Sequence, residues 1–157
     1  MTDEEYMRLA LSEAKRAADL DEVPVGCVVV RRGEIIAEAH NTRETGKCAL
    51  DHAELLAIRD ACRKAGGWRL NDTTLYVTLE PCPMCAGAIL NARIDRVVIG
   101  ARDPRAGAFG SLFDLNALPL NHKTEITEGV LADESANLLS SFFKRKRAKP
   151  GKGDATE

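Results

Sequence analysis

Two short fragments of the chain contain the residue types that hold a catalytic metal ion. His52-Ala53-Glu54 supplies an imidazole and a carboxylate, and Pro81-Cys82-Pro83-Met84-Cys85 supplies two thiols. One imidazole and two thiolates are three of the four ligands of a tetrahedral zinc ion, so the fourth position is left to water. The fragments therefore predict a Zn2+ site at His52, Cys82 and Cys85, with Glu54 placed to take a proton from that water.

Both fragments are expected at the start of a helix. Asp51 is a candidate N-cap for a helix over 52–65, and Pro83 suits the first turn of a helix over 82–92. The positive end of a helix lowers the pKa of a cysteine and favours the thiolate that zinc binds. Cys82 and Cys85, one turn apart, can therefore close on one ion together with His52.

Two plainer interpretations of these residues stay open. Asp51-x-x-Glu54 has the spacing of a capping box, so Glu54 could be no more than a helix cap. Cys48 lies four residues before His52 and could supply a fourth ligand, which would give a closed structural site without chemistry. Cys48 precedes the expected cap, however, and would have to fold back over the water position.

The rest of the chain alternates strands with helices. Apolar residues at helical spacing predict a first helix over 4–19 and a last one over 132–147. Strands are expected over 25–30, 34–39, 74–79, 96–100 and 124–127. Arg31-Arg32-Gly33 should join the first two strands as a hairpin, because its glycine can adopt positive φ. This alternation predicts an α/β fold in which helices cover both faces of one sheet.

Length and composition predict one domain. The chain has 157 residues, 45% of them apolar, and no apolar run approaches the ~20 residues that cross a bilayer. We expect a single domain over 1–149, ending in a basic helix, followed by a disordered tail over 150–157. The acidic start does not resemble a targeting peptide, and five cysteines with one Cys-x-x-Cys favour metal binding over disulfides. A cytoplasmic protein without membrane association is expected.

Positive charge is concentrated at the C-terminal end. The formal net charge is -2, yet residues 144–157 hold six of the 22 Lys and Arg and two of the 24 Asp and Glu, a local charge of +4. Lys144-Arg145-Lys146-Arg147 follows Phe142-Phe143, and cations beside aromatic rings can pair with phosphates while a base stacks. The alternative is a solvated helix end whose cations suit the helix dipole.

Taken together, the motifs resemble the zinc-dependent cytidine and deoxycytidylate deaminase superfamily. His-x-Glu followed by Pro-Cys-x-x-Cys is its metal signature. Within it, the chain is similar to the bacterial tRNA-specific adenosine deaminases over nearly its whole length. The matching stretches are 22–26, 68–70, 75–82, 84–89, 110–112, 121–122 and 142–143.

The resemblance implies a fold and a reaction. The fold is the cytidine-deaminase-like three-layer α/β/α sandwich, with a five-stranded mixed sheet. One Zn2+ per subunit would be bound by His52, Cys82 and Cys85. The activated water would attack C6 of adenosine at the wobble position of tRNA while Glu54 shuttles protons, and inosine and ammonia would result.

The resemblance also implies partners and substrate contacts. Asn41 would contact the base, Val25 would pack against it, and Asp103 would lie near the nucleotide. The basic helix would reach the anticodon arm, with arginine tRNA as the expected substrate, and the enzyme would be a homodimer. The substrate-binding residues expected on this basis are Val25, Asn41, Ala53, Pro81, Asp103, Phe143, Lys146 and Arg147.

One stretch departs from the family pattern. Family members commonly have Asp-Pro-Thr-Ala before the zinc histidine, whereas this chain has Cys48-Ala49-Leu50-Asp51. If the Asp51 carboxylate faced the pocket instead of capping the helix, it could repel phosphate. A free nucleobase or nucleoside, of the guanine, cytosine or adenosine type, would then be the substrate. A zinc or RNA-binding module without catalysis is the third alternative, and it depends on Cys48.

Overall fold

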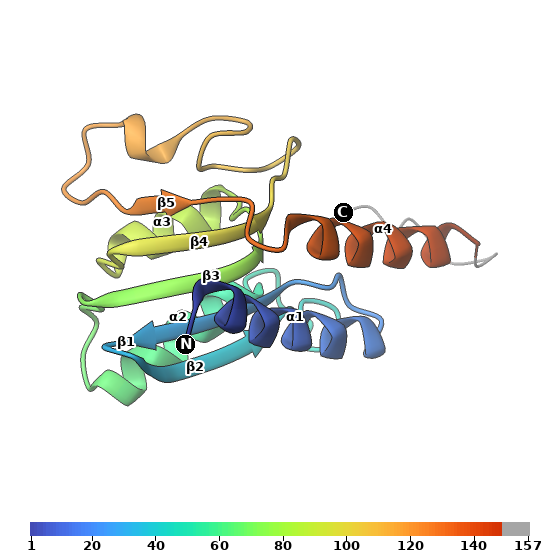
Figure 1. Ribbon diagram of the computed structural model, residues 1–157, viewed down its shortest axis with the longest axis horizontal. Coiled ribbons are helices and arrows are strands. Elements are labelled where there is room, and N and C mark those ends of the chain that lie inside the picture. Colours follow the sequence, from blue (N-terminus) through green and yellow to red (C-terminus); the bar gives the residue numbers. More distant parts are fainter. Residues whose placement is uncertain (149–157) are drawn as a thin grey trace.

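A five-stranded sheet separates two layers of helices in the computed structural model, which describes residues 1–148 (Figure 1). The helices are α1 (Asp3–Asp19), α2 (Ala53–Ala65), α3 (Pro83–Asn91) and α4 (Ala132–Ala148). The strands are β1 (Gly26–Arg31), β2 (Glu34–His40), β3 (Thr73–Leu79), β4 (Arg96–Ala101) and β5 (Glu125–Thr127), and a short 3-10 helix, η1, covers Leu115–Ala117.

The sheet is mixed, with the strand order β2-β1-β3-β4-β5. β1 pairs antiparallel with β2 and β3, whereas β3 with β4 and β4 with β5 are parallel. The hairpin between β1 and β2 turns at Arg32 and Gly33, with φ of 50° and 80°. Positive φ at both central residues is the geometry of the hairpin turns that match strand twist, and Gly33 adopts it without strain.

Each face of the sheet has its own apolar core. On one face Val28, Val30 and Tyr76 pack against Tyr6 and Met7 of α1. On the opposite face the alternate strand residues, among them Val29 and Val77, pack against α2 and α3. Successive residues of a strand point to opposite faces, so the continuous β-branched run in β1 serves both cores.

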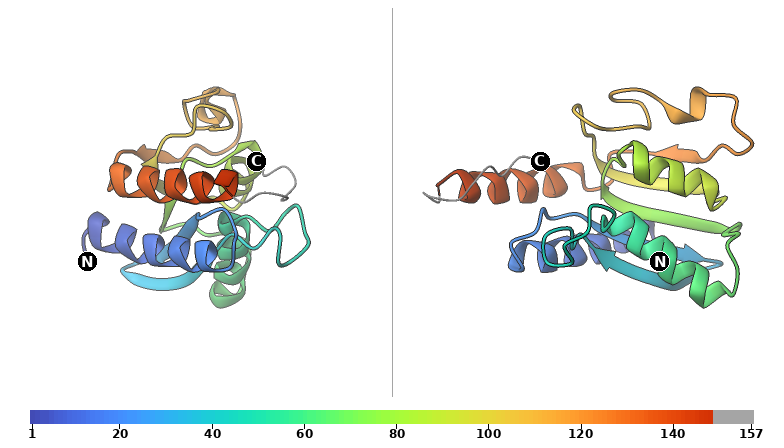
Figure 2. Two further views of the ribbon diagram at one scale, coloured as in Figure 1. Left: turned by 90° about the vertical axis from the view of Figure 1, so that its right-hand side faces the viewer. Right: turned by 180° about the vertical axis from the view of Figure 1, so that it is seen from behind.

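The helices are arranged in pairs. α1 and α4 lie side by side on one face of the sheet, and α2 and α3 cover the other (Figure 2). α4 projects beyond the sheet at the end where α2 and α3 begin (Figure 2). Arg8 of α1 pairs with Glu134 of α4 at 3.0 Å, which links the two helices of the first layer.

The three-layer sandwich and its five-stranded mixed sheet are as predicted. Every expected strand and helix is present, with bounds that differ by one residue at most. The expected tail over 150–157 lies outside the described residues. Among residues 1–148, no helix is both long and apolar enough to cross a membrane.

Candidate metal centre

Two of the three candidate zinc ligands are N-cap residues. His52 is the N-cap of α2, and Cys82 is the N-cap of α3, which has Pro83 in its first turn. Neither side chain caps its own helix, so both are available to a metal ion. Cys85 lies inside α3, one turn beyond Cys82, and is buried. The prediction that both fragments begin helices is confirmed.

The expected helix cap at Asp51 is wrong. α2 begins one residue later than predicted, so His52 occupies the N-cap and Glu54 is the second helical residue. Asp51 and Glu54 therefore do not form a capping box. The Asp51 carboxylate lies against its own loop, because a Cβ atom placed on Gly46 would overlap Asp51 Oδ2.

The three donor atoms have the spacing that one zinc ion requires. His52 Nδ1 lies 3.6 Å from Cys82 Sγ and 3.5 Å from Cys85 Sγ. Bond lengths of about 2.3 Å to sulfur and about 2.05 Å to nitrogen put tetrahedral ligands roughly 3.6 Å apart. Among residues 1–148 this is the only cluster of three or more such donors, and Cys48 is not part of it. The closed four-ligand site is therefore not formed.

The pKa values of the two cysteine ligands are shifted in opposite directions. A hydrogen bond from the Cys85 thiol, together with contact to His52, lowers the pKa of Cys82 to about 4 despite its partial burial. The same hydrogen bond to Cys82, with burial, raises the pKa of Cys85. The hydrogen bond to Cys82 also raises the pKa of His52. Zinc would therefore meet one thiolate and displace the proton of the other thiol.

Glu54 is buried beside the donor set, with only 4% of its surface exposed. Burial raises the pKa of its carboxyl group to about 7, against the lowering effects of its own backbone amide and of His52. A carboxyl group with a pKa near the working pH can both accept and return a proton. The burial of Glu54 thus favours the protonated carboxyl group more than water would.

Comparisons with known proteins identify the family. Residues 1–101 match the model of the cytidine and deoxycytidylate deaminase zinc-binding region. The chain belongs to this deaminase family. It is 51% identical to the tRNA-specific adenosine deaminase of Bacillus subtilis, over 94% of this chain and 92% of that protein.

Solved structures of deaminases are similar as well. One, from studies of A-to-I editing by tRNA:A34 deaminases at the wobble position of transfer RNA, has a TM-score of 0.81 and 42% identity, covering 86% of this chain and 99% of that one. The guanine deaminase of Bacillus subtilis has a TM-score of 0.64 and 30% identity, covering 99% of this chain and all of that one. Both likenesses extend over most of this deaminase.

Four of the expected substrate-binding residues lie in two places. Two of them are next to a metal ligand in the chain, and the other two lie where β1 begins and β2 ends. Ala53 and Pro81 are buried and directly adjoin His52 and Cys82 in the chain. Asn41 is buried, and its Nδ2 donates to the Val23 carbonyl at 3.2 Å while its Oδ1 accepts from Arg43 N at 3.1 Å. Val25 is half-buried and its carbonyl accepts from Asn41 N at 3.1 Å, so these two side chains belong to one corner of the molecule.

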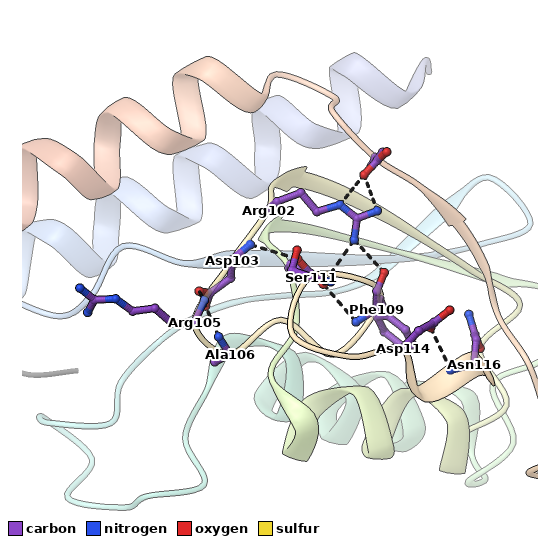
Figure 3. Close-up of polar contacts among 10 residues, drawn as sticks. Arg102, Asp103, Arg105, Ala106, Phe109, Ser111, Asp114 and Asn116 are labelled. Carbon is purple, nitrogen blue, oxygen red and sulfur yellow. Dashed lines mark hydrogen bonds and ion pairs between the residues drawn. The ribbon is translucent and has the colours of Figure 1, made fainter. Parts of the chain in front are cut away.

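The other expected contacts lie on two separate elements. The Asp103 carboxylate accepts from Arg105 N and Ala106 N in the turn that follows β4 (Figure 3). Phe143 packs edge-on against Phe142 in α4. Lys146 pairs with Asp21 at the end of α1 at 2.7 Å and is only 19% exposed, whereas Arg147 is exposed.

Two buried glutamates, Glu22 and Glu80, were not predicted as functional residues. Glu22 accepts hydrogen bonds from the backbone amides of Glu44 and Thr45. Glu80 is the residue after β3 and accepts from residues beyond β4. For Glu80 the available signal was a charged residue directly after an apolar strand and directly before the metal motif, since a buried charge requires partners.

Proposed function

We propose that this deaminase hydrolyses adenosine to inosine at the wobble position of tRNA. The observation that supports the chemistry is the cluster of His52, Cys82 and Cys85 beside a buried Glu54. Similarity supports the substrate, because the protein from Bacillus subtilis that is 51% identical is a tRNA-specific adenosine deaminase. The guanine deaminase of that organism is a more distant relative, at 30% identity.

Different residues of the chain would bind the metal ion and transfer protons in this reaction. His52, Cys82 and Cys85 would hold zinc, which when bound lowers the pKa of a water molecule in its fourth position towards neutrality. Glu54 would accept a proton as water adds to C6, and would then deliver protons to the ring nitrogen and to the amine. Ammonia leaves, and the C6 oxygen of inosine comes from water.

The substrate has to present an unstacked base, since C6 is out of reach inside a stack. We propose that Asn41 contacts this base, because the hydrogen bonds to Val23 and Arg43 hold its amide in one orientation. Val25, Ala53, Pro81 and Asp103 would complete the pocket. Phe143, Lys146 and Arg147 would contact the anticodon arm, since α4 projects from the end of the sheet where α2 and α3 begin (Figure 2).

We also propose that two copies of the chain form a homodimer. Four large apolar side chains between β4 and β5 are exposed, namely Leu112, Phe113, Leu118 and Leu120. One of the four, Leu120, lines a pocket together with Met84 and Leu90 of α3. Apolar surface of this kind marks interaction sites. Light scattering should give twice the mass of the chain, and Leu118→Glu should shift it towards the monomer.

Two further proposals concern the setting of the enzyme. All five cysteines are free, including the ligands Cys82 and Cys85, and zinc thiolates persist in a reducing compartment. We therefore propose a cytoplasmic location, where tRNA is found.

We propose that residues 1–149 act as one deaminase domain, since both helix layers share one sheet.

The substrate can be tested with purified, zinc-loaded protein. The anticodon stem-loop of an arginine tRNA with a wobble adenosine is compared with free adenosine, guanine and cytosine, and inosine and ammonia are measured. We expect inosine from the stem-loop alone. Ammonia from guanine but not from RNA would assign the chain to guanine deamination, and no product from any substrate with zinc bound would overturn the enzyme proposal.

A further inference from the structure

A buried carboxylate lies between the sheet and the metal-binding segment. Glu80 is the residue after Leu79, which ends β3, and it precedes the ligand Cys82 by two positions. Its side chain has no exposed surface. An ionised carboxylate removed from water has to be compensated by hydrogen bonds or by a cation. The partners of Glu80 therefore indicate which part of the protein it organises.

All of these partners belong to residues 102–111, which follow β4. Glu80 Oε1 accepts from Asp103 N at 3.0 Å and from the Ser111 hydroxyl. Glu80 Oε2 accepts from Phe109 N and Ser111 N, each at 3.1 Å, and lies 3.3 Å from Arg102 Nη1. One side chain thus binds both the beginning and the end of the 103–111 loop.

Arg102 adds a second set of contacts to this arrangement. Its Nη1 donates to the Phe109 carbonyl at 2.7 Å (Figure 3). Its guanidinium also pairs with Glu128, which lies between β5 and α4. The positive charge of Arg102 therefore lies between the carboxylates of Glu80 and Glu128. Glu80 and Arg102 thus both bind the 103–111 loop, and both of them bind the backbone of Phe109.

Gly107 brings the loop into direct contact with the carboxylate. A Cβ atom placed on Gly107 would overlap the carboxylate carbon and both oxygens of Glu80. The next residue, Ala108, donates its amide to the Pro81 carbonyl at 2.9 Å. Pro81 directly precedes Cys82, so the loop lies against the segment that supplies a zinc ligand.

We propose that Glu80 is a positioning residue, which fixes the 103–111 loop beside the metal centre so that Asp103 and the loop backbone meet the substrate nucleotide in one geometry. Glu80 itself touches neither the substrate nor the metal ion. The substrate part of this inference rests on the proposed function. The attachment of the loop by Glu80 does not, and it can be tested without a substrate.

The first test measures steady-state kinetics on the anticodon stem-loop. Glu80→Gln is nearly isosteric, but it puts an NH2 group opposite backbone N–H donors. We expect KM to rise about tenfold while kcat stays within about threefold and zinc remains bound, because a misplaced loop weakens binding of the ground state and the transition state alike. An unchanged KM, or a loss of kcat with KM unchanged, would overturn the proposal.

Two companion variants separate positioning from general destabilisation. Glu128→Gln changes the outer partner of Arg102 without contacting the loop, and it should alter KM by less than about twofold. Gly107→Ala displaces the Glu80 carboxylate from the loop side and should reproduce the higher KM. In combination with Glu80→Gln it should add little, since both changes break the same contacts. Independent, multiplicative effects would contradict the proposal.

The second test measures amide hydrogen exchange of the zinc-loaded protein without substrate. In Glu80→Gln the amides of Asp103, Phe109 and Ser111 should exchange at least about tenfold faster, while those of β4 keep their protection. Unchanged exchange at these three amides would overturn the attachment. If the wild type deaminates no RNA, the proposed function fails, and the exchange experiment still decides whether Glu80 attaches the loop. Should Glu80→Gln not fold, Gly107→Ala gives the same measurement.

Discussion

The 42–51 loop before α2 and the 103–111 loop after β4 are both held by a buried glutamate from a distant part of the chain. Glu22 holds the first loop through two backbone amides, those of Glu44 and Thr45. Glu80 holds the second through three backbone amides and one hydroxyl, with Arg102 as a cation beside it. In both loops a buried carboxylate accepts hydrogen bonds from the backbone, but Glu80 makes more of these contacts than Glu22.

The larger difference lies in what each glutamate is attached to. Glu22 precedes Val23, whose carbonyl binds the Asn41 side chain, so the first loop is tied to the residues expected to contact the base. Glu80 precedes Pro81 and Cys82, so the second loop is tied to the segment that holds the metal. A disturbance in the first loop should act on Asn41 and its contact with the base, whereas one in the second loop should act on Asp103 and the nucleotide while zinc stays bound.

The largest effect is expected at Glu54, which belongs to neither loop. Glu54→Ala should lower turnover by a factor of about 10² to 10⁴, because the acid–base group is removed while the three metal ligands stay. Zinc content is measured by mass spectrometry beside the rate of inosine formation. Retention of a tenth of the activity with zinc bound would show that Glu54 is not the proton shuttle.

A matched pair of glycine substitutions tests how firmly the 42–51 and 103–111 loops are held. Gly107→Ala places its Cβ against the fully bonded Glu80 and should cost about 1–3 kcal/mol of unfolding free energy. Gly46→Ala places its Cβ against Asp51 Oδ2, on a partly exposed side chain that can rotate away, and 2.9 Å from the backbone oxygen of Thr42. Only the Thr42 contact has to be relieved by the backbone, so the cost should be smaller than at Gly107 by about 1 kcal/mol. Urea unfolding measures both. Equal costs would mean that the two loops are held equally firmly.

The basic end of α4 belongs to neither loop and tests the RNA contact separately. Replacing Lys144, Arg145 and Arg147 by Ala leaves the pair of Lys146 with Asp21 in place. Binding of the stem-loop should weaken about tenfold, and the slope of log K against log salt should flatten by about 0.7 for each lost phosphate contact. Affinities over a range of salt concentrations measure this. An unchanged slope would mean that α4 does not bind phosphate.

The smallest effect is expected at Asp3, a carboxylate that touches neither loop and serves as the reference. Hydrogen bonds from Arg96 lower the pKa of Asp3 below its usual 3.8 against the effect of burial. A folded pKa below the unfolded one contributes stability above pH 3.8, and this contribution is lost as the pH falls through the folded pKa. Because both groups are partly exposed, Asp3→Asn should cost about 0.5–1 kcal/mol at pH 7.

Unfolding measured from pH 7 down to pH 2 checks this expectation. The difference between wild type and Asp3→Asn should shrink at acid pH, where the Asp3 carboxylate is protonated and no longer pairs with Arg96. A difference that stays constant down to pH 2 would contradict the assigned ion pair.

The helices, the strands and the zinc ligands could be predicted from the sequence because their signals are local. Apolar periodicity and turn residues located each strand and each α-helix to within one residue, whereas the 3-10 helix η1 was not predicted. The spacing of His52, Cys82 and Cys85 predicted the metal ligands, because helix starts present such side chains together. The cap at Asp51 was predicted wrongly, since cap residues are recognised by type and the chain before His52 has its own hydrogen bonds, such as Asp51 N to Cys48 O at 3.1 Å.

The sequence by itself therefore determined the order of the elements, the two-sided sheet and the chemistry of the metal site. Only the tertiary structure decided how the loops beside that site are held. Glu22 and Glu80 bind amides 22 to 31 residues away in the chain, and such contacts have no period or motif. Such contacts arise because folding removes the carboxylate from water. The carboxylate then has to be hydrogen-bonded by the backbone amides that the tertiary structure places next to it.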